Sequence, residues 1–455
     1  MQQREKFSSR LGFILISAGC AIGLGNVYRF PIITGAYGGA IFVLIYIGFL
    51  LLLGLPIMTV ELAVGRGSLR SIASSFDVLE KKGQKWHLMK YVGIGGNYLL
   101  MMCYTVITGW MLTYFVKYLS GSIMSAHTVE ELGNVFGALV SSPAKVIIGA
   151  YAAILLGLFV CSLGLEKGVE RITKVMMLAL FVLMIGLAIY ACTLSGAGRG
   201  LRFYLVPNAD NIKHAGIGKV INAAMGQAFF TLSLGIGSIA IFGSYIDKDR
   251  RLLGESATII SLDTFVALMS GLIIFPAYYT YNESMIEGEG GAGFLFTTFS
   301  SIFNNMEGGR ILGALFFLFM SFAAMSTVIA VFENIMSFWL ELTPLKRPVV
   351  AAINVGLMLV LVLPAAFSLN LISDFKIFGM AIMDLEDYVV SNLLLPIGSL
   401  VYVLFCTSRF GWGWKNYIEE VNMGDRGAKM PGWIRPYMTF ALPCIIVIVL
   451  LLSVF

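Results

Sequence analysis

Eleven apolar segments, each long enough to cross a lipid bilayer, dominate this 455-residue sequence. A membrane-spanning helix needs about 20 mostly apolar residues, because the hydrocarbon core is about 30 Å thick. The segments cover residues 11–36, 40–65, 90–119, 145–163, 172–194, 219–244, 252–280, 311–340, 348–368, 377–406 and 434–454. The loops are short, and the longest are 66–89, 195–218, 281–310 and 407–433. The chain contains no second region with a different overall composition. We therefore expect one all-α membrane domain over residues 1–455.

The composition excludes several classes of protein. Apolar residues make up 58% of the chain, and charged residues 13%, about half the usual ~25%. A soluble enzyme, a disordered chain or a nucleic-acid-binding module could not cover its surface with so little charge, so the expected surroundings are a lipid bilayer. A Walker A motif is missing, which disfavours an ATP-driven pump. The six Cys lie singly without a CxxC pair, so a metal or disulfide framework is not predicted.

The distribution of basic residues predicts the orientation of the chain. If the N-terminus is cytoplasmic, 22 of the 31 Lys and Arg residues lie on the inner side and eight on the outer side. Lys and Arg concentrate in cytoplasmic loops of membrane proteins. We expect a multi-pass protein of the plasma (inner) membrane, with the C-terminus outside because the number of spans is odd. The first apolar run continues too long for a cleavable signal and is expected to be a span.

Two glycine-rich interruptions lie at matching places in the first and sixth segments. The first reads GCAIGLGN at residues 19–26, and the second reads SLGIGS at residues 233–238. They are five segments apart, and an odd offset reverses the direction of the chain. This spacing predicts a 5+5 inverted repeat of residues 11–194 and 219–406, with 434–454 as an extra helix. Interrupted helices in two inverted halves indicate a transporter with its binding site near the membrane midplane.

The first interruption offers backbone groups to a ligand. Each Gly costs about 1 kcal/mol relative to Ala inside a helix, so three Gly within seven residues favour local unwinding. Lipid cannot bind the freed groups, whereas a cation can bind the carbonyls and an anionic substrate the amides. Asn26 adds a side-chain oxygen. The alternative is close helix packing through small residues, but Asn26 and Arg29 directly after the Gly residues favour a site.

Hydroxyl groups occur beside the second interruption and in the eighth segment. Thr231 and Ser233 flank the break in the sixth segment, where the alternative is hydrogen bonding of each hydroxyl to its own helix. The matching break in the first segment favours a site. In the eighth segment, Ser326 and Thr327 are adjacent hydroxyls that suit a hard monovalent cation, although this pair alone is weak evidence.

Ionisable residues within apolar segments are functional candidates, because a charge at the bilayer centre costs at least ~2.5–3.5 kcal/mol. They are Arg29, Glu61, Asp263, Glu333, Asp384, Glu386 and Asp387. Asp263 either pairs with a basic residue or binds a cation or proton. Its segment offers no Lys or Arg between residues 252 and 281, which favours the cation or proton. Asp384, Glu386 and Asp387 are expected near the middle of the tenth segment, and Arg29 is the one mid-membrane cation available to them.

Three motifs resemble the neurotransmitter:sodium symporter family, in its bacterial amino-acid transporter branch. They are RLGFILISAGCAIGLGNVYRFP at residues 10–31, QAFFTLSLGIG at 227–237 and GSYIDKD at 243–249. The similarity extends over spans 1–10. It implies unwound helices 1 and 6 and sodium-coupled import of amino acids by alternating access, with two Na⁺ ions as cofactors.

The resemblance also implies a role for individual residues. The first sodium site would use the Ala21 carbonyl, Asn26, Thr231, Asp263 and the substrate carboxylate; the second would use the carbonyls of Gly19, Ile22 and Ala323 and the hydroxyls of Ser326 and Thr327. The substrate would meet the amides of Gly23 to Gly25, the Tyr104 hydroxyl, carbonyls near Phe230, Thr231 and Ser326, and a pocket of Leu100, Phe230, Ser233, Ile236, Val328 and Val331. The outer gate would be Arg29, Gln227 and Asp387 with Phe230 as its lid, and the inner gate Arg4, Ser244, Tyr245 and Glu341.

Three departures from the family pattern refine these expectations. The family usually has twelve spans, whereas this chain has eleven, as some bacterial members do. Position 263 is usually Asn, and the Asp found here can take over the charge that chloride supplies in some relatives, so chloride is not expected. Gly23 stands where amine transporters carry Asp. A substrate must then bring its own carboxylate, which favours amino acids, with an apolar or aromatic side chain.

Three other functions are weighed against transport. An ion channel predicts continuous polarity along a pore and no paired helix breaks. A membrane-embedded enzyme needs a nucleophile with a base, or a metal set, and no His lies within a span near such a partner. A sensor that binds an amino acid and sodium without transporting them remains the alternative.

Overall fold

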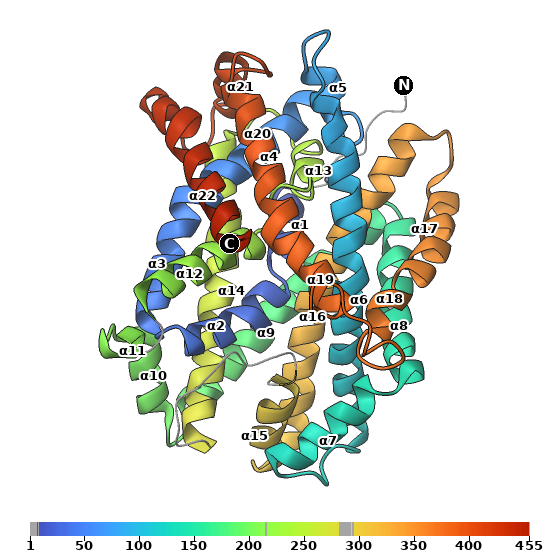
Figure 1. The fold of residues 1–455 in the computed structure, drawn as a ribbon, viewed down its shortest axis with the longest axis vertical. Helices are drawn as coiled ribbons and strands as arrows, with labels where there is room; N and C mark the ends of the chain where they lie inside the picture. Colours follow the sequence, from blue (N-terminus) through green and yellow to red (C-terminus); the bar gives the residue numbers. More distant parts are fainter. Residues whose placement is uncertain (1–6, 8, 214–215, 282–292, 294, 455) are drawn as a thin grey trace.

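The computed structural model describes residues 7, 9–213, 216–281, 293 and 295–454. Almost all of them are helical, and two isolated bridges are the only β-type pairing in these ranges. Within these ranges, nine helices are long and apolar enough to cross a membrane, and the broken first segment makes ten. Figure 1 shows the long helices as a tilted bundle, with α16 and α6 near its middle. The expected all-α membrane architecture is confirmed.

The predicted segments correspond to helices or to runs of consecutive helices. The first is α1 (Arg10–Ala21), η1 (Gly25–Arg29) and α2 (Phe30–Ala36), and the second is α3 (Ala40–Phe49), η2 (Leu50–Gly54) and α4 (Leu55–Ser68). The third to fifth are η3 (Trp86–Leu88) with α6 (Met89–Ser120), α8 (Pro143–Ser162), and η4 (Leu165–Glu170) with α9 (Arg171–Cys192). The sixth to eighth are α12 (Ile217–Thr231) with α13 (Ala240–Gly243), α14 (Leu252–Tyr281) and α16 (Gly309–Leu342). The last three are α17 (Arg347–Leu361) with α18 (Leu363–Phe367), α19 (Ile382–Tyr388) with η6 (Val389–Leu394) and α20 (Leu395–Thr407), and η7 (Gly432–Ile434) with η8 (Tyr437–Ala441) and α22 (Leu442–Val454).

The loops between these segments contain short helices that cover the two ends of the bundle. At the lower end in Figure 1 lie α7 (Val129–Val140), α10 (Ala197–Leu205), α11 (Asp210–Lys213) and α15 (Ser300–Asn304), which follows η5 (Leu295–Phe299). At the upper end lie α5 (Ser75–Leu79) and α21 (Trp414–Val421). The length of the apolar segments identifies only the long spans, so the short helices of the loops were not predicted.

The core forms around α16, which packs against α6, α8, α9 and α1. Small residues allow close contact between helices, as between α6 and α8. A Cβ added to Gly109 of α6 would lie 2.6 Å from the backbone nitrogen of Ala150 on α8. The backbones therefore touch, which is how transmembrane helices gain packing energy without a hydrophobic driving force. Some glycines therefore serve helix packing, and others lie in the two breaks.

The tenth segment begins later than its composition suggests. Phe378 and Gly379 have positive φ angles of 53° and 80°, and Ala381 is extended before α19 begins at Ile382. This turn keeps residues 377–381 out of the helix. Asp384 consequently lies in the first turn of α19 and is exposed, whereas we expected it near the middle of a span.

Candidate functional site

The first segment is broken where the glycines predict it. Helix α1 ends at Ala21, Ile22 is extended with ψ of 102°, and the chain resumes as η1 and α2 at an angle of 54°. Side chains bind two of the amides in the break. The Asn26 Oδ1 accepts a hydrogen bond from the Gly23 amide (3.1 Å), and the Tyr104 hydroxyl accepts one from the Leu24 amide (2.9 Å).

The position of Gly23 leaves no room for a side chain. A Cβ added there would lie 2.5 Å from the Thr327 Oγ1 and would also overlap the Tyr104 hydroxyl. Real Cβ atoms essentially never approach another atom below 3.0 Å. Gly23 is thus required by the close approach of α6 and α16 to the break.

The sixth segment is broken over eight residues, between the end of α12 at Thr231 and the start of α13 at Ala240. Ser233, Gly235 and Gly237 all have positive φ angles, of 49°, 99° and 79°. Such angles are rare for residues other than Gly, which makes Ser233 an uncommon conformation. Backbone groups freed in a membrane must find other partners.

Two buried polar residues supply partners to this break. The Glu61 carboxylate on α4 accepts hydrogen bonds from the amides of Gly235 (3.0 Å) and Ile239 (3.3 Å). On α6, the Asn97 Nδ2 donates to the Ile236 carbonyl (2.8 Å). The sequence identified Glu61 only as a buried acid, and it gave no signal for Asn97 because one polar residue in an apolar helix is common.

Asp263 of α14 lies beside both breaks and is fully buried. Its Oδ1 accepts a hydrogen bond from the Asn26 Nδ2 (2.8 Å), and the Thr231 hydroxyl lies 3.3 Å from each of its oxygens. Within the part of the chain that the structure describes, no Lys or Arg forms an ion pair with it. The structure therefore brings Asn26, Thr231 and the Asp263 carboxyl group together.

A second group of oxygens lies between α1 and α16. The Thr327 hydroxyl is 3.2 Å from the carbonyl oxygens of both Gly19 and Ile22 and 3.4 Å from that of Cys20. The Ser326 hydroxyl is 2.8 Å from the carbonyl oxygen of Ala323 and 3.3 Å from that of Ile22. A hydroxyl has a single proton to donate. The Thr327 proton cannot satisfy three carbonyls, so this group is richer in oxygen than in donors.

A small cavity lies between the two breaks. It is lined by Ala21, Gly23, Gly25, Leu100, Tyr104, Phe230, Thr231, Ser233, Thr327 and Leu395. Eight of these were expected near a substrate from the sequence. Thr327 was expected only as a cation ligand. Leu395, at the start of α20, was not expected, because only the acidic residues of the tenth segment were functional candidates.

Four residues expected around the substrate do not line this cavity. They are Ile236, Ser326, Val328 and Val331, all of them buried. The Ile236 side chain lies against Gly96 of α6, and the Val328 side chain lies against Gly157 of α8. One helix can turn only part of its circumference toward a cavity, and on α16 that part carries Thr327.

Two of the residues expected in the outer gate, Arg29 and Gln227, contact residues that line the cavity. The Arg29 guanidinium lies 4.4 Å from the centre of the Phe230 ring, and the Gln227 Nε2 donates to the Gly25 carbonyl (2.7 Å). Asp387 accepts a hydrogen bond from Ser391 (3.1 Å). In the described ranges Arg29 has no salt bridge to Asp387. Arg29 instead lies over the ring that borders the cavity.

Residues expected in the inner gate join a buried polar network. The Tyr245 hydroxyl is 2.8 Å from Ser337 and 3.2 Å from Glu333, which pairs with Arg347 (2.8 Å). Ser244 donates to the Ile241 carbonyl (2.5 Å).

Glu341, at the end of α16, accepts hydrogen bonds from the Ser71 amide and the Ser74 hydroxyl, both at 2.7 Å. Arg4 lies outside the described residues. The role of Arg347 was not predicted, since it follows the eighth segment among other loop lysines and arginines.

Comparisons with known proteins agree with this geometry. The model of the sodium:neurotransmitter symporter family matches residues 4–132 and 138–455. The sodium-dependent transporter YhdH of Bacillus subtilis is 32% identical over 99% of this chain and 98% of its own, and a sodium-dependent transporter of Haemophilus influenzae is 28% identical over 100% and 99%.

The solved structure of MhsT in complex with L-phenylalanine matches with a TM-score of 0.87 and 33% identity, over 100% of both chains. The expected family is confirmed: this chain belongs to the sodium:neurotransmitter symporter family.

Proposed function

We propose that this chain is a sodium-coupled symporter that imports amino acids, with an apolar or aromatic side chain, by alternating access. The observation that carries the proposal is the meeting of two broken helices at a cavity beside Asp263, a buried carboxylate without an ion pair in the described ranges. An uncompensated charge in a membrane is costly, and a bound cation removes that cost. MhsT, which has the same fold, was solved with L-phenylalanine.

Two sodium ions are proposed at the two oxygen groups. The first would bind near Asp263, Asn26 and Thr231, with the Ala21 carbonyl, and the carboxylate of the substrate would complete its shell. The second would bind between α1 and α16, where Ser326 and Thr327 face several carbonyls. Both groups consist of oxygen atoms, which are the ligands of hard cations.

The substrate is proposed to lie in the cavity between the breaks. Its carboxylate would approach the amides around Gly23 and Gly25 and the Tyr104 hydroxyl, all of which border the cavity. Phe230 and Leu100 supply apolar walls, and no acidic side chain lines the cavity to receive a monoamine. These groups favour an amino acid with an apolar or aromatic side chain.

The sodium gradient can drive this transport without ATP. One Na⁺ that moves down 100 mV releases about 2.3 kcal/mol, and a tenfold concentration gradient adds about 1.4 kcal/mol. Two ions together supply about 7 kcal/mol. In the proposed cycle, Arg29, Gln227, Asp387 and Phe230 close the site on the outer side before Tyr245 and Glu341 release it on the inner, N-terminal side.

The proposal predicts sodium-dependent binding that needs Asp263 and is independent of chloride. Purified protein should bind labelled L-phenylalanine in NaCl or sodium gluconate and lose at least tenfold in affinity when Na⁺ is replaced by choline. Asp263→Asn removes the fixed charge with little change of volume, and should abolish binding or make it respond to chloride. Binding by the variant that equals the wild type and ignores chloride would refute the assignment of Asp263.

A further inference from the structure

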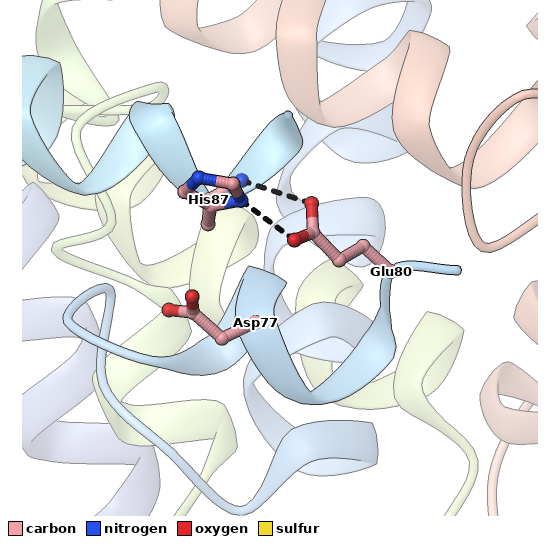
Figure 2. A group of neighbouring side chains, drawn as sticks. All are labelled: Asp77, Glu80 and His87. Carbon is pink, nitrogen blue, oxygen red and sulfur yellow. Dashed lines mark hydrogen bonds and ion pairs between the residues drawn. The ribbon is translucent and has the colours of Figure 1, made fainter. Parts of the chain in front are cut away.

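We propose that Asp77, Glu80 and His87 form a binding site for a divalent transition-metal cation on the loop between α4 and α6. One potential ligand atom from each residue lies within 4.8 Å of the others. Figure 2 shows the Glu80 carboxylate facing His87, with the Asp77 side chain below them; Asp77 belongs to α5 and His87 to η3. This site is separate from the cavity between the broken helices, and the proposal does not depend on the transport function.

The local fold explains why these residues meet. Asp77 lies in the five-residue helix α5, and Glu80 is the extended residue that directly follows it. The chain then reverses through residues 81–85, where Gly83 has a φ of 87°. Nothing lies within 4 Å of a Cβ added to Gly83. Glycine is therefore favoured at this position by the positive φ angle and not by a close contact. After the turn, η3 places His87 opposite Glu80.

Both arms of the loop are anchored to the end of α20. The Phe76 ring packs against Phe405 with 4.7 Å between centroids, and the Trp86 ring packs against the same residue at 5.4 Å. The Trp86 Nε1 also donates to the Phe410 carbonyl (2.7 Å). Because Phe76 and Trp86 are each adjacent to a proposed ligand, this packing holds the two arms at a fixed separation. A pre-formed site loses less entropy when a metal binds.

Two of the three proposed ligands already contact each other. The His87 Nδ1 lies 2.6 Å from one Glu80 carboxylate oxygen, and the His87 backbone amide donates to the other (3.1 Å). The Lys90 ammonium lies 3.5 Å from Asp77, which is a long contact at an exposed carboxylate. Exposed ion pairs contribute about 0–1 kcal/mol, so Lys90 is a weak competitor for a divalent ion.

The donor atoms select the class of cation. Two carboxylates balance a double positive charge, and one imidazole nitrogen favours Zn²⁺ and its neighbours over Mg²⁺ or Ca²⁺, which prefer oxygen ligands alone. Three protein ligands leave at least one position for water on Zn²⁺. The bound ion would join α5 to η3 and close the turn that carries Lys81, Lys82 and Lys85.

The first test is Zn²⁺ titration of the full chain in detergent, against a chromophoric chelator. We expect one Zn²⁺ per chain, and at least tenfold weaker binding in His87→Gln and in Asp77→Asn. The matched control is His127→Gln, because His127 makes its hydrogen bonds through its backbone amide and carbonyl. A hundredfold excess of Mg²⁺ should leave Zn²⁺ bound. Failure to bind Zn²⁺ at 100 µM, or unchanged binding in both variants, would overturn the proposal.

Limited proteolysis tests whether the ion binds to this loop. Lys81, Lys82 and Lys85 are exposed and are sites for trypsin. Zn²⁺ should slow cleavage after these lysines at least threefold in the wild type and in His127→Gln, and should leave the rate unchanged in His87→Gln. Equal protection in His87→Gln would show that the ion acts elsewhere and would contradict the proposed site.

Discussion

At the scale of single residues, the buried carboxylates of the spans differ in the partners that the fold gives them. Glu61 binds two backbone amides, Asp263 binds Asn26, and Glu333 pairs with Arg347. Glu386 of α19 is only 4% exposed, and in the part of the chain that the structure describes neither of its carboxylate oxygens has a hydrogen-bond partner. An ionised carboxylate in that position would be costly, so we infer that Glu386 is neutral in this conformation.

This difference predicts opposite effects of two Glu-to-Gln substitutions. Glu386→Gln replaces a neutral acid by a neutral amide and should leave thermal stability in detergent unchanged or higher. Glu333→Gln removes the charged group that pairs with Arg347, and breaking a buried ion pair costs about 3–5 kcal/mol. The melting temperatures of both variants and the wild type provide the comparison. An equal loss in both would contradict the neutral state of Glu386.

Gly23 provides the second prediction at this scale. An added methyl group would overlap the Tyr104 hydroxyl and lie 2.5 Å from Thr327, so Gly23→Ala should displace the break and abolish sodium-dependent binding of phenylalanine. Gly95→Ala is the matched control, because nothing lies within 4 Å of a Cβ at that position of α6. Equilibrium binding measures both. If Gly23→Ala retained wild-type affinity, the break would not be as tightly packed as the structure shows.

At the scale of elements, the break in the sixth segment depends on acceptors from its neighbours. Glu61 holds the amides of Gly235 and Ile239, and Glu61→Gln keeps only one acceptor oxygen. A buried amide without a partner costs about 1–3 kcal/mol, so this variant should lose that much stability and bind sodium more weakly. Chemical denaturation and sodium titration measure the two effects. Glu307→Gln is the control, since Glu307 is exposed.

If Glu61→Gln melted and bound sodium like Glu307→Gln, the break would be stable without Glu61, and our description of this element would fail.

Both helix breaks were predictable from the sequence, because Gly clusters occur at matching places in two apolar segments and Asn26 and Arg29 directly follow the first of them. The residues that hold the breaks were less predictable. Asn97 and Leu395 are single residues in apolar helices, and only the packing of α6 and α20 against the sixth segment gives them a role. The start of the tenth span was also missed, since the turn at Phe378 and Gly379 is apolar enough to resemble a helix.

At the scale of the whole molecule, α16 and α6 form a continuous centre beside which the two broken segments lie (Figure 1). Unbroken helices pair their backbone groups internally, whereas the two breaks need side chains of neighbouring helices as partners, and residues of both breaks line the cavity. A ligand at the cavity therefore contacts several elements at once: α6 through Tyr104, α16 through Thr327, and both breaks. This arrangement allows the occupied site to bias the position of whole helices, as alternating access requires.

The most direct test of the account is uptake of labelled L-phenylalanine into proteoliposomes that contain the purified protein. With sodium outside and potassium inside, we predict accumulation well above the external concentration, and its loss when sodium is equal on both sides. Binding that needs sodium, but without any accumulation above empty liposomes, would contradict a symporter and identify the chain as a sodium-dependent sensor.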